Sequence, residues 1–266
     1  MPDQLDRLRD VLRSYQRVIV AFSGGADSAF LAWVARDTLG AESAAAVTAV
    51  SPSLAGDERD DCAALAREWG LRWRTVATDE MVNVAYLRND GERCYHCKAA
   101  LMDALTPVLA AAEGATVVLG VNVDDLGDHR PGQRAAAERG ARFPLVEATF
   151  TKADVREWSR RLGLRTWDKP AAACLASRLP YGTPVSIGVL SQVERAERAL
   201  RRLGFDELRV RHYDDVARIE VPLTALAAMV ERRDEVVLAV RAAGYQYVTV
   251  DLEGLRSGNL NAALSH

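Results

Sequence analysis

Residues 17–28 read RVIVAFSGGADS, an apolar run that ends in two glycines and a polar turn. The apolar part, residues 17–22, is typical of a buried parallel strand. Apolar side chains then recur at helical spacing between Ser28 and Leu39, and Gly40 ends that pattern. A strand that turns through glycines directly into a helix predicts the first β-α unit of an α/β fold.

The alternation of strand and helix continues along the chain. We expect strands at 44–50, 71–77 and 116–121, and helices at 58–69, 96–112 and 153–162. Pro107 lies within one of these helices and is expected to kink it. Repeated β-α units predict a doubly wound parallel sheet, and we assign residues 1–166 to this domain.

The pattern changes after residue 166. Residues 167–184 contain three prolines and several small residues, which is typical of a loop between domains. Beyond the loop we expect helices at 187–203 and 223–243, a strand pair at 208–213 and 216–221, and a final strand at 245–252. Residues 167–266 are therefore predicted to form a smaller α+β domain that includes the loop.

The composition limits the functions that are open to the chain. It has 266 residues, of which 49% are hydrophobic and 27% charged, and a formal net charge of -3. This balance argues against a protein that mainly grips a nucleic-acid backbone, so we expect no nucleic-acid partner. No apolar run is long enough to span a bilayer and no signal peptide is evident, so we expect a cytoplasmic protein without a membrane partner.

The glycine turn between the first strand and the first helix is a candidate nucleotide site. Glycines allow the backbone at Gly24 and Gly25 to turn sharply, and the start of a helix offers unpaired N–H groups to an anion. Ser23 and Ser28 add hydroxyl groups, and Asp27 adds a carboxylate. The loop lacks the Gly-Lys-Ser/Thr of a Walker loop. The alternative is a tight turn in which Asp27 or Ser28 caps the helix.

The four cysteines do not form the pattern of a disulfide framework. Cys94 and Cys97 form a Cys-x-x-Cys pair, and Cys174 is a remote partner. Two thiolates three residues apart can share one metal, and three thiolates suit a metal or cluster with one open position. The alternatives are a zinc site completed by His96, or buried reduced thiols. Cys62 falls within the apolar pattern of a predicted helix and is expected in the core.

Several charged or polar residues lie beside these motifs. Lys98 and Arg178 carry cationic groups that bind phosphate oxygens, so we assign them as catalytic residues that hold ATP or the adenylate. Asp124 and Asp125 follow a strand end, where their carboxylates suit Mg²⁺ bound to pyrophosphate. Loop capping is the alternative for one of them. We also assign Ser51, which follows the second strand, to the nucleotide site.

A second group of basic residues lies in the C-terminal domain. Arg209 and Arg211 alternate along a predicted strand and therefore point to one face. Two guanidinium groups on one face suit the phosphate of a nucleotide substrate, and a solvated strand face is the alternative. The remaining lysines, Lys152 and Lys169, either take part in this chemistry or are solvated charges.

Two resemblances to known families add to this interpretation. Ser23–Ser28, placed directly after an apolar strand, resembles the PP-loop of the ATP pyrophosphatase superfamily. That superfamily cleaves ATP between the α and β phosphates and transfers the adenylyl group to a substrate oxygen. Three further segments resemble the LarE family of pyridinium-dicarboxylate sulfur transferases: 168–182 (DKPAAACLASRLPYG), 124–132 (DDLGDHRPG), and 209–211 (RVR) with 217–220 (ARIE).

The LarE resemblance implies an ATP-dependent sulfur transferase that forms AMP and pyrophosphate. Its substrate would be a pyridinium-3,5-dicarboxylate mononucleotide, whose carboxylates become the thiocarboxylates of the nickel-pincer nucleotide used by lactate racemase and related enzymes. One branch of the family sacrifices the sulfur of a cysteine at the position of Cys174, and the other holds a [4Fe-4S] cluster on three cysteines. Because this chain also has Cys94 and Cys97, it resembles the cluster branch.

The implied cofactors are ATP, Mg²⁺ and a [4Fe-4S] cluster, with sulfide or another sulfur donor as a partner, and we expect a homo-oligomer. Three alternatives stay open. The first is the same reaction with Cys174 as a sacrificial donor. The second is another PP-loop reaction, such as tRNA thiolation or an amide-forming synthetase. The third is a non-catalytic nucleotide-binding module with a structural zinc.

Overall fold

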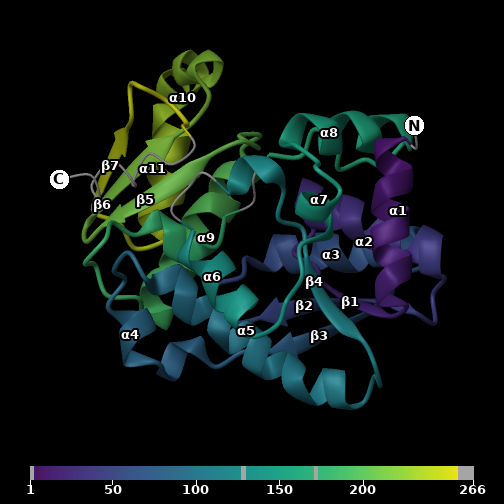
Figure 1. Cartoon of the computed structure of the whole chain (residues 1–266). Coiled ribbons are helices and arrows are strands. Elements are labelled where there is room, and N and C mark those ends of the chain that lie inside the picture. Colours follow the sequence, from purple (N-terminus) through teal and green to yellow (C-terminus); the bar gives the residue numbers. More distant parts are fainter. Residues whose placement is uncertain (1–2, 127–129, 171–172, 257–266) are drawn as a thin grey trace. The chain divides into compact units, whose positions relative to one another are not determined.

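The computed structural model describes residues 3–126, 130–170 and 173–256 (Figure 1). Contacts within the chain divide it into two compact units. Unit 1 comprises residues 1–80 and 94–172, and unit 2 comprises residues 81–93 and 173–266. The predicted assignment of separate functions to residues 1–166 and 167–266 stays a prediction.

Unit 1 contains a four-stranded sheet in which every pair of neighbouring strands is parallel. The strand order is β3-β2-β1-β4, with bounds β1 (Val18–Ala21), β2 (Ala44–Val50), β3 (Arg72–Ala77) and β4 (Thr116–Leu119). Ile19 lies opposite Ala45 on one neighbour and Val117 on the other. The predicted α/β class with a parallel sheet is therefore confirmed.

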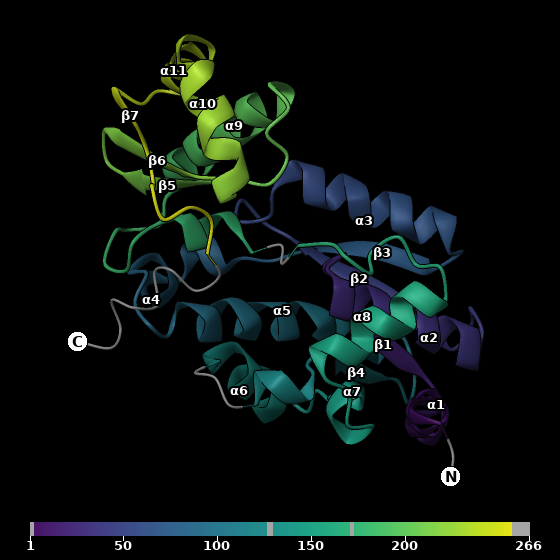
Figure 2. The same cartoon turned by 90° about the horizontal axis from the view of Figure 1, so that it is seen from above.

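Helices cover both faces of this sheet because its strands are apolar on both sides. The longer helices of unit 1 are α1 (Gln4–Tyr15), α2 (Ala26–Leu39), α3 (Gly56–Glu68), α5 (Arg93–Ala110), α6 (Pro131–Glu138) and α8 (Lys152–Arg161). Val20 packs with Leu8 and Phe30 on one face, whereas Ile19 packs with Leu105 on the other. Figure 2 shows the sheet between α3 and α5. Two shorter elements, η2 (Val123–Asp125) and α7 (Pro144–Glu147), also belong to unit 1, and η1 (Glu80–Val82) lies at the boundary between the units in the sequence.

Gly120 follows β4 and lies directly against the start of α2. A Cβ atom at this position would lie 2.7 Å from the backbone nitrogen of Ser28 and 2.8 Å from the carbonyl carbon of Asp27. Both atoms belong to the backbone, so neither can move aside without shifting the helix. Glycine at residue 120 thus allows the end of β4 to approach the loop between β1 and α2.

We expect the substitution Gly120→Ala to destabilise the protein by about 1–3 kcal/mol, as is typical of overpacking, and to displace the start of α2. Thermal or denaturant unfolding measures the change. Gly188→Ala is the control, because the nearest atom to its added Cβ is the Ser186 hydroxyl at 4.0 Å. Equal stability of the two variants would contradict the close approach.

Unit 2 contains a three-stranded sheet in the order β5-β6-β7. Strands β5 (Arg209–Tyr213) and β6 (Val216–Glu220) are antiparallel, and β7 (Tyr247–Val250) runs parallel to β6. The apolar face of the sheet packs on α9 (Ile187–Arg202) and α11 (Arg233–Ala242), so that Val210 and Ile219 share a core with Leu200 and Val236. The predicted strand at 245–252 is present but shorter. Two short elements, α4 (Val84–Leu87) and η3 (Leu175–Arg178), also belong to this unit.

The single helix predicted over residues 223–243 is wrong. The structure instead has η4 (Leu223–Ala225), α10 (Leu226–Glu231) and α11, with a break at Arg232. Arg232 has φ -96° and ψ 24°, which lies outside helical geometry. Its guanidinium donates to the carbonyl oxygen of Leu203 and pairs with Glu235 at 2.8 Å. These contacts hold the break, and the apolar periodicity on either side does not reveal it.

No helix in the described part of the chain is long and apolar enough to cross a membrane.

Candidate active site

The loop predicted to bind nucleotide connects β1 to α2. Gly24 has φ +72°, a conformation that favours glycine. The Ser28 hydroxyl donates to the Gly25 carbonyl at 3.1 Å and lies 3.0 Å from the Ser23 hydroxyl. Gly25 is the N-cap of α2, and no side chain of the described residues caps this helix start. The alternative in which Asp27 or Ser28 acts as the cap is therefore wrong, and the N–H groups of the first turn remain available to an anion.

Asp27 lies on the first turn of α2 beside polar residues that follow β4. The side-chain amide of Asn122 donates to the Asp27 carboxylate at 3.3 Å. Burial, and then the negative charge of Asp125, raise the pKa of Asp27 above its usual value. Because burial and a neighbouring negative charge make the Asp27 carboxylate costly to ionise, a cation beside it would be bound favourably. Sequence reasoning missed Asn122, whose fully buried position beside the loop depends on a contact between distant parts of the chain.

Asp125 and Asp124 have different surroundings. Asp125 is buried, accepts the backbone N–H of Asn122 at 3.2 Å, and lies 3.0 Å from Arg130 Nη2 and 3.1 Å from Lys152 Nζ. Asp124 is exposed and accepts the backbone N–H of Lys152 at 2.8 Å. Asp125 thus has the loop-capping role considered for one of the two, and Asp124 instead contacts the start of α8. Asp125 combines with Asp27 to form an acidic pair at the nucleotide loop. Residues 127–129 of the same segment, which include His129, lie outside the described residues.

The four cysteines differ in exposure. Cys62 is fully buried, as predicted, and burial raises the pKa of its thiol to about 11. A thiol with such a pKa stays protonated and unreactive at neutral pH. Cys94 is exposed, and Cys97 and Cys174 are partly exposed. Across residues 3–126, 130–170 and 173–256, no three histidine, cysteine, aspartate or glutamate side chains come together in a way that would hold a metal ion.

Cys94 and Cys97 lie near the start of α5. Residues three apart on a helix lie on the same side, so the two thiols face a common region. Lys98 follows on the same helix and is partly exposed. Ser51 follows β2 and is also partly exposed; its hydroxyl accepts the backbone N–H of Ser53 at 3.2 Å. The roles of Lys98 and Ser51 in binding nucleotide stay predictions.

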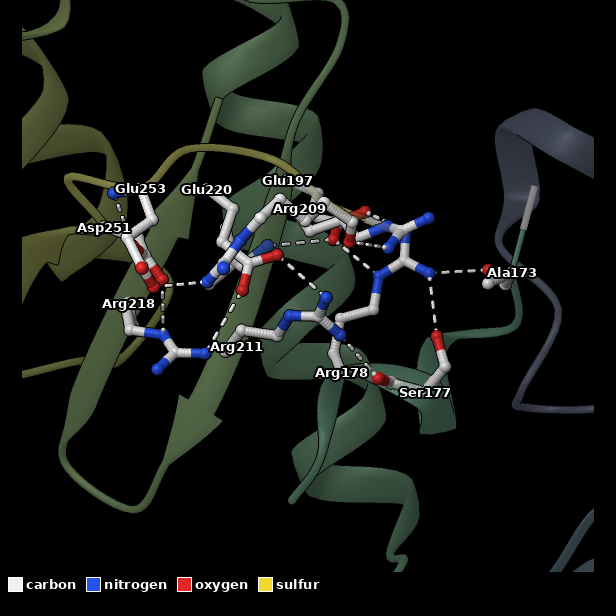
Figure 3. Close-up of polar contacts among 12 residues, drawn as sticks. Ala173, Ser177, Arg178, Glu197, Arg209, Arg211, Arg218, Glu220, Asp251 and Glu253 are labelled. Atoms are coloured by element: carbon white, nitrogen blue, oxygen red, sulfur yellow. Dashed lines mark hydrogen bonds and ion pairs between the residues drawn. The ribbon is translucent and has the colours of Figure 1, made fainter. Parts of the chain in front are cut away.

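The backbone around Cys174 is held by the side chain of Arg178. One nitrogen of Arg178, Nη1, donates to the carbonyl oxygens of Ala173 at 2.6 Å and Cys174 at 3.3 Å. The other two nitrogens donate to the Glu197 carboxylate at 2.8 and 3.1 Å. Figure 3 shows Arg178 between these two sets of partners. Arg178 is buried, and the contact of its guanidinium with a phosphate stays a prediction.

Arg209 and Arg211 both lie on β5, two residues apart (Figure 3). Arg211 is buried, pairs with Glu220 at 2.8 Å and donates to the carbonyl oxygen of Ser177 at 2.8 Å. Arg209 is partly exposed and donates to the carbonyl oxygen of Arg256 at 3.2 Å. Burial, followed by the positive charges of Arg178 and Arg211, lowers the pKa of Arg209. This concentration of positive charge favours an anion at Arg209.

Two buried carboxylates complete the arginine cluster, and sequence reasoning assigned neither of them a role. Glu197 is 1% exposed on α9, and Glu220 is fully buried on β6. A charged residue at an apolar position of a helix was the available signal for Glu197, since Val193 and Leu200 on the same helix are buried. Glu220 lies opposite Arg209 in the β5–β6 hairpin, and this signal can be read from the sequence only if the register of the hairpin is known.

Comparison with known proteins identifies a matching family model and related proteins that align with nearly the whole chain. The family model of NAD synthase matches residues 3–101, which include the nucleotide loop. An uncharacterized protein of Synechocystis is 45% identical over 100% of this chain and 99% of its own length. The pyridinium-3,5-bisthiocarboxylic acid mononucleotide synthase of Lactiplantibacillus plantarum is 38% identical over 96% of this chain and 92% of its own length. An uncharacterized protein of Methanocaldococcus jannaschii is 27% identical over 91% of this chain and 92% of its own length.

The similarity to the Lactiplantibacillus plantarum synthase extends through both structural units, and the NAD synthase match covers the β1–α2 loop of an ATP-using domain. The protein is therefore an ATP-dependent enzyme, and the chain belongs to the LarE family of pyridinium-3,5-bisthiocarboxylic acid mononucleotide synthases.

Proposed function

We propose that the protein is an ATP-dependent sulfur transferase that converts the carboxylates of pyridinium-3,5-dicarboxylate mononucleotide to thiocarboxylates, for the synthesis of a nickel-pincer nucleotide. The observation that carries the proposal is the 38% identity, over nearly the whole chain, to a synthase named for the bisthiocarboxylic acid product. The uncapped loop beside Asp27 and Asp125 supports the ATP-dependent half of the reaction.

The first half-reaction activates the carboxylate. A carboxylate oxygen of the substrate attacks the α-phosphorus of MgATP, the bond from this phosphorus to the bridging oxygen of pyrophosphate breaks, and a carboxyl adenylate forms. The N–H groups at the start of α2 would bind phosphate oxygens, and Asp27 and Asp125 would bind the Mg²⁺ that accompanies ATP. We assign Ser23, Gly24, Gly25, Ser28 and Ser51 to the nucleotide. Lys98 would contribute its positive charge to the phosphates or to the adenylate.

The second half-reaction delivers sulfur. A sulfur nucleophile attacks the carbonyl carbon of the adenylate, and the bond between this carbon and the AMP oxygen breaks. We assign the sulfur site to Cys94, Cys97 and Cys174, whose thiols are all at least partly exposed and suit iron by ligand chemistry. A [4Fe-4S] cluster on three cysteines would supply one iron with an open position for sulfide. The rival is the donation of the Cys174 sulfur itself.

The phosphate of the mononucleotide is assigned to the arginine cluster of unit 2. Arg211 is committed to Glu220 and to the Ser177 carbonyl, and Arg178 is committed to Glu197 and to the Cys174 segment. Arg209 has only a carbonyl contact among the polar contacts described, and its charge is not balanced by a carboxylate partner at hydrogen-bond distance. We therefore assign the direct phosphate contact to Arg209, with Arg211 adding charge behind it.

We expect Arg209→Gln to weaken binding of the mononucleotide substrate about tenfold to a hundredfold, the effect of losing one charge-assisted contact. Binding titration or the KM for the mononucleotide measures this. The matched control is Arg202→Gln, which changes an exposed arginine of α9 in the same unit. Unchanged substrate affinity in a folded Arg209→Gln protein would rule out this assignment.

One experiment tests the proposed activation step. Anaerobically purified protein is given MgATP with and without pyridinium-3,5-dicarboxylate mononucleotide, and the nucleotide products are separated. We expect AMP and pyrophosphate, formed in proportion to the added mononucleotide. Formation of ADP and phosphate, or formation of AMP at the same rate with and without the mononucleotide, would contradict the proposal.

A further inference from the structure

Lys169 lies on the chain that leads to Cys174, and its ammonium group contacts the nucleotide loop. Lys169 Nζ donates to Glu58 Oε2 at 2.8 Å, to Asp61 Oδ2 at 2.7 Å and to the carbonyl oxygen of Gly24 at 3.2 Å. The side chain is only 18% exposed, so the solvated alternative is wrong. Burial by itself lowers the pKa of Lys169, but the hydrogen bonds with Asp61 and Glu58 outweigh burial and raise it. Lys169 is therefore a fixed cation.

The contact with Gly24 affects the direction of an N–H group in the loop. In a planar trans peptide the C=O and the following N–H point in opposite directions. When Lys169 holds the carbonyl oxygen of Gly24, the N–H of Gly25 must point away from Lys169. This N–H belongs to the N-cap of α2, where the loop presents its donors. Lys169 thus fixes the orientation of one donor before any anion arrives.

The same contact anchors the chain that carries the sulfur site. Arg165, four residues earlier, pairs with Asp61 at 2.6 Å and with Glu68 at 2.9 Å, so both basic residues attach this segment to α3. Among the contacts of the described residues, Lys169 reaches the nucleotide loop, whereas Arg165 contacts Asp61 and Glu68. Cys174 lies five positions after Lys169, and an extended chain of that length spans at most about 18 Å. The covalent chain therefore keeps Cys174 within that distance of Lys169.

We propose that Lys169 is a positioning residue for sulfur delivery, which holds the segment leading to Cys174 on the nucleotide loop so that the activated carboxylate meets sulfur rather than water. This inference rests on the proposed function. Loss of the anchor leaves adenylate exposed to hydrolysis, in which water attacks the carbonyl carbon, AMP leaves and the original carboxylate returns. ATP is then consumed without sulfur transfer.

The test is the number of thiocarboxylates formed per pyrophosphate released, measured in the full-length protein with MgATP, sulfide and the mononucleotide. We expect Lys169→Met to lower this ratio about tenfold or more, because it loses the charge-assisted hydrogen bond to the Gly24 carbonyl together with both ion pairs to α3. A smaller folded fraction would reduce both products equally and leave the ratio unchanged, so the ratio separates positioning from stability. Glu58→Gln, which removes the negative charge from one of the two carboxylate partners of Lys169, should lower the ratio less and provides a milder variant if Lys169→Met does not fold.

Arg165→Met is the matched control, because it removes the other basic partner of Asp61 without touching Gly24. We expect it to keep the wild-type ratio. An unchanged ratio in both Lys169→Met and Glu58→Gln, or an equal fall in Arg165→Met, would overturn the inference while leaving the proposed function intact. Failure of the wild-type protein to release pyrophosphate in the presence of the mononucleotide would instead overturn both this inference and the proposed function.

Discussion

The substitution Asp27→Asn is expected to reduce pyrophosphate release from ATP about a hundredfold or more, as is typical when a preorganised electrostatic contact is removed. The variant keeps the size of the side chain and an oxygen that can accept from Asn122. It removes one of the two carboxylates assigned to Mg²⁺. A steady-state assay of pyrophosphate measures the loss. Asp124→Asn is the control, because Asp124 is exposed and accepts the backbone N–H of Lys152, a contact that the side-chain oxygen of asparagine can also make.

The same variant should make the nucleotide-free protein more stable. The folded-state pKa of Asp27 is raised by burial and by Asp125, so the folded protein binds this proton more tightly than the unfolded chain does. The stability contribution of Asp27 is therefore fully present below its ordinary pKa and is lost as the pH rises through the raised value. We expect Asp27→Asn to have the higher melting temperature at neutral pH, with a difference that shrinks on acidification. A less stable variant with wild-type ATP cleavage would contradict both expectations.

The substitution Cys174→Ala is expected to abolish thiocarboxylate formation while leaving adenylation measurable, because Cys174 is assigned to sulfur delivery alone. Production of thiocarboxylate and release of pyrophosphate are measured in the same reaction. Cys62→Ala is the control, since Cys62 is fully buried and its thiol stays protonated. Sulfur transfer by the Cys174→Ala protein at the wild-type rate would remove Cys174 from the mechanism.

Companion variants distinguish the cluster from a sacrificial cysteine. If the three cysteines share a [4Fe-4S] cluster, Cys94→Ala and Cys97→Ala lose iron and sulfur transfer together. If Cys174 is sacrificed, these two variants still transfer sulfur once, and Cys174 becomes dehydroalanine with the loss of one hydrogen sulfide. The intact mass of the protein after reaction therefore separates the two. Dehydroalanine in place of Cys174 would contradict the cluster.

Local sequence signals predicted the central β-α units and the nucleotide loop. The four strands of unit 1 match their predicted positions because the apolar runs of β1, β2 and β4, and the glycine before the more polar β3, are local patterns. Helix α1 was not predicted, although Leu5, Leu8 and Leu12 are buried at helical spacing. The break at Arg232 was missed because its cause is a contact with Leu203, a residue 29 positions away.

The surroundings of the site were harder to predict because they depend on distant contacts. The approach of Gly120 to Ser28 requires β4 to lie beside β1 in the sheet. The partners of Lys169 come from α3 and from the loop, more than 100 residues earlier in the chain. Motifs therefore predicted the residues to which we assign the chemistry, whereas the contacts that hold them in position became evident only in the folded structure.

The most direct test of the central claim is the mass of the small-molecule product. Protein purified without oxygen is incubated with MgATP, sulfide and pyridinium-3,5-dicarboxylate mononucleotide, and the mononucleotide is then analysed by mass spectrometry. The account predicts a product in which sulfur has replaced one oxygen of a carboxylate, with one AMP and one pyrophosphate formed for each sulfur incorporated. A mononucleotide recovered unchanged, or converted to an amide when ammonia is supplied in place of sulfide, would contradict it.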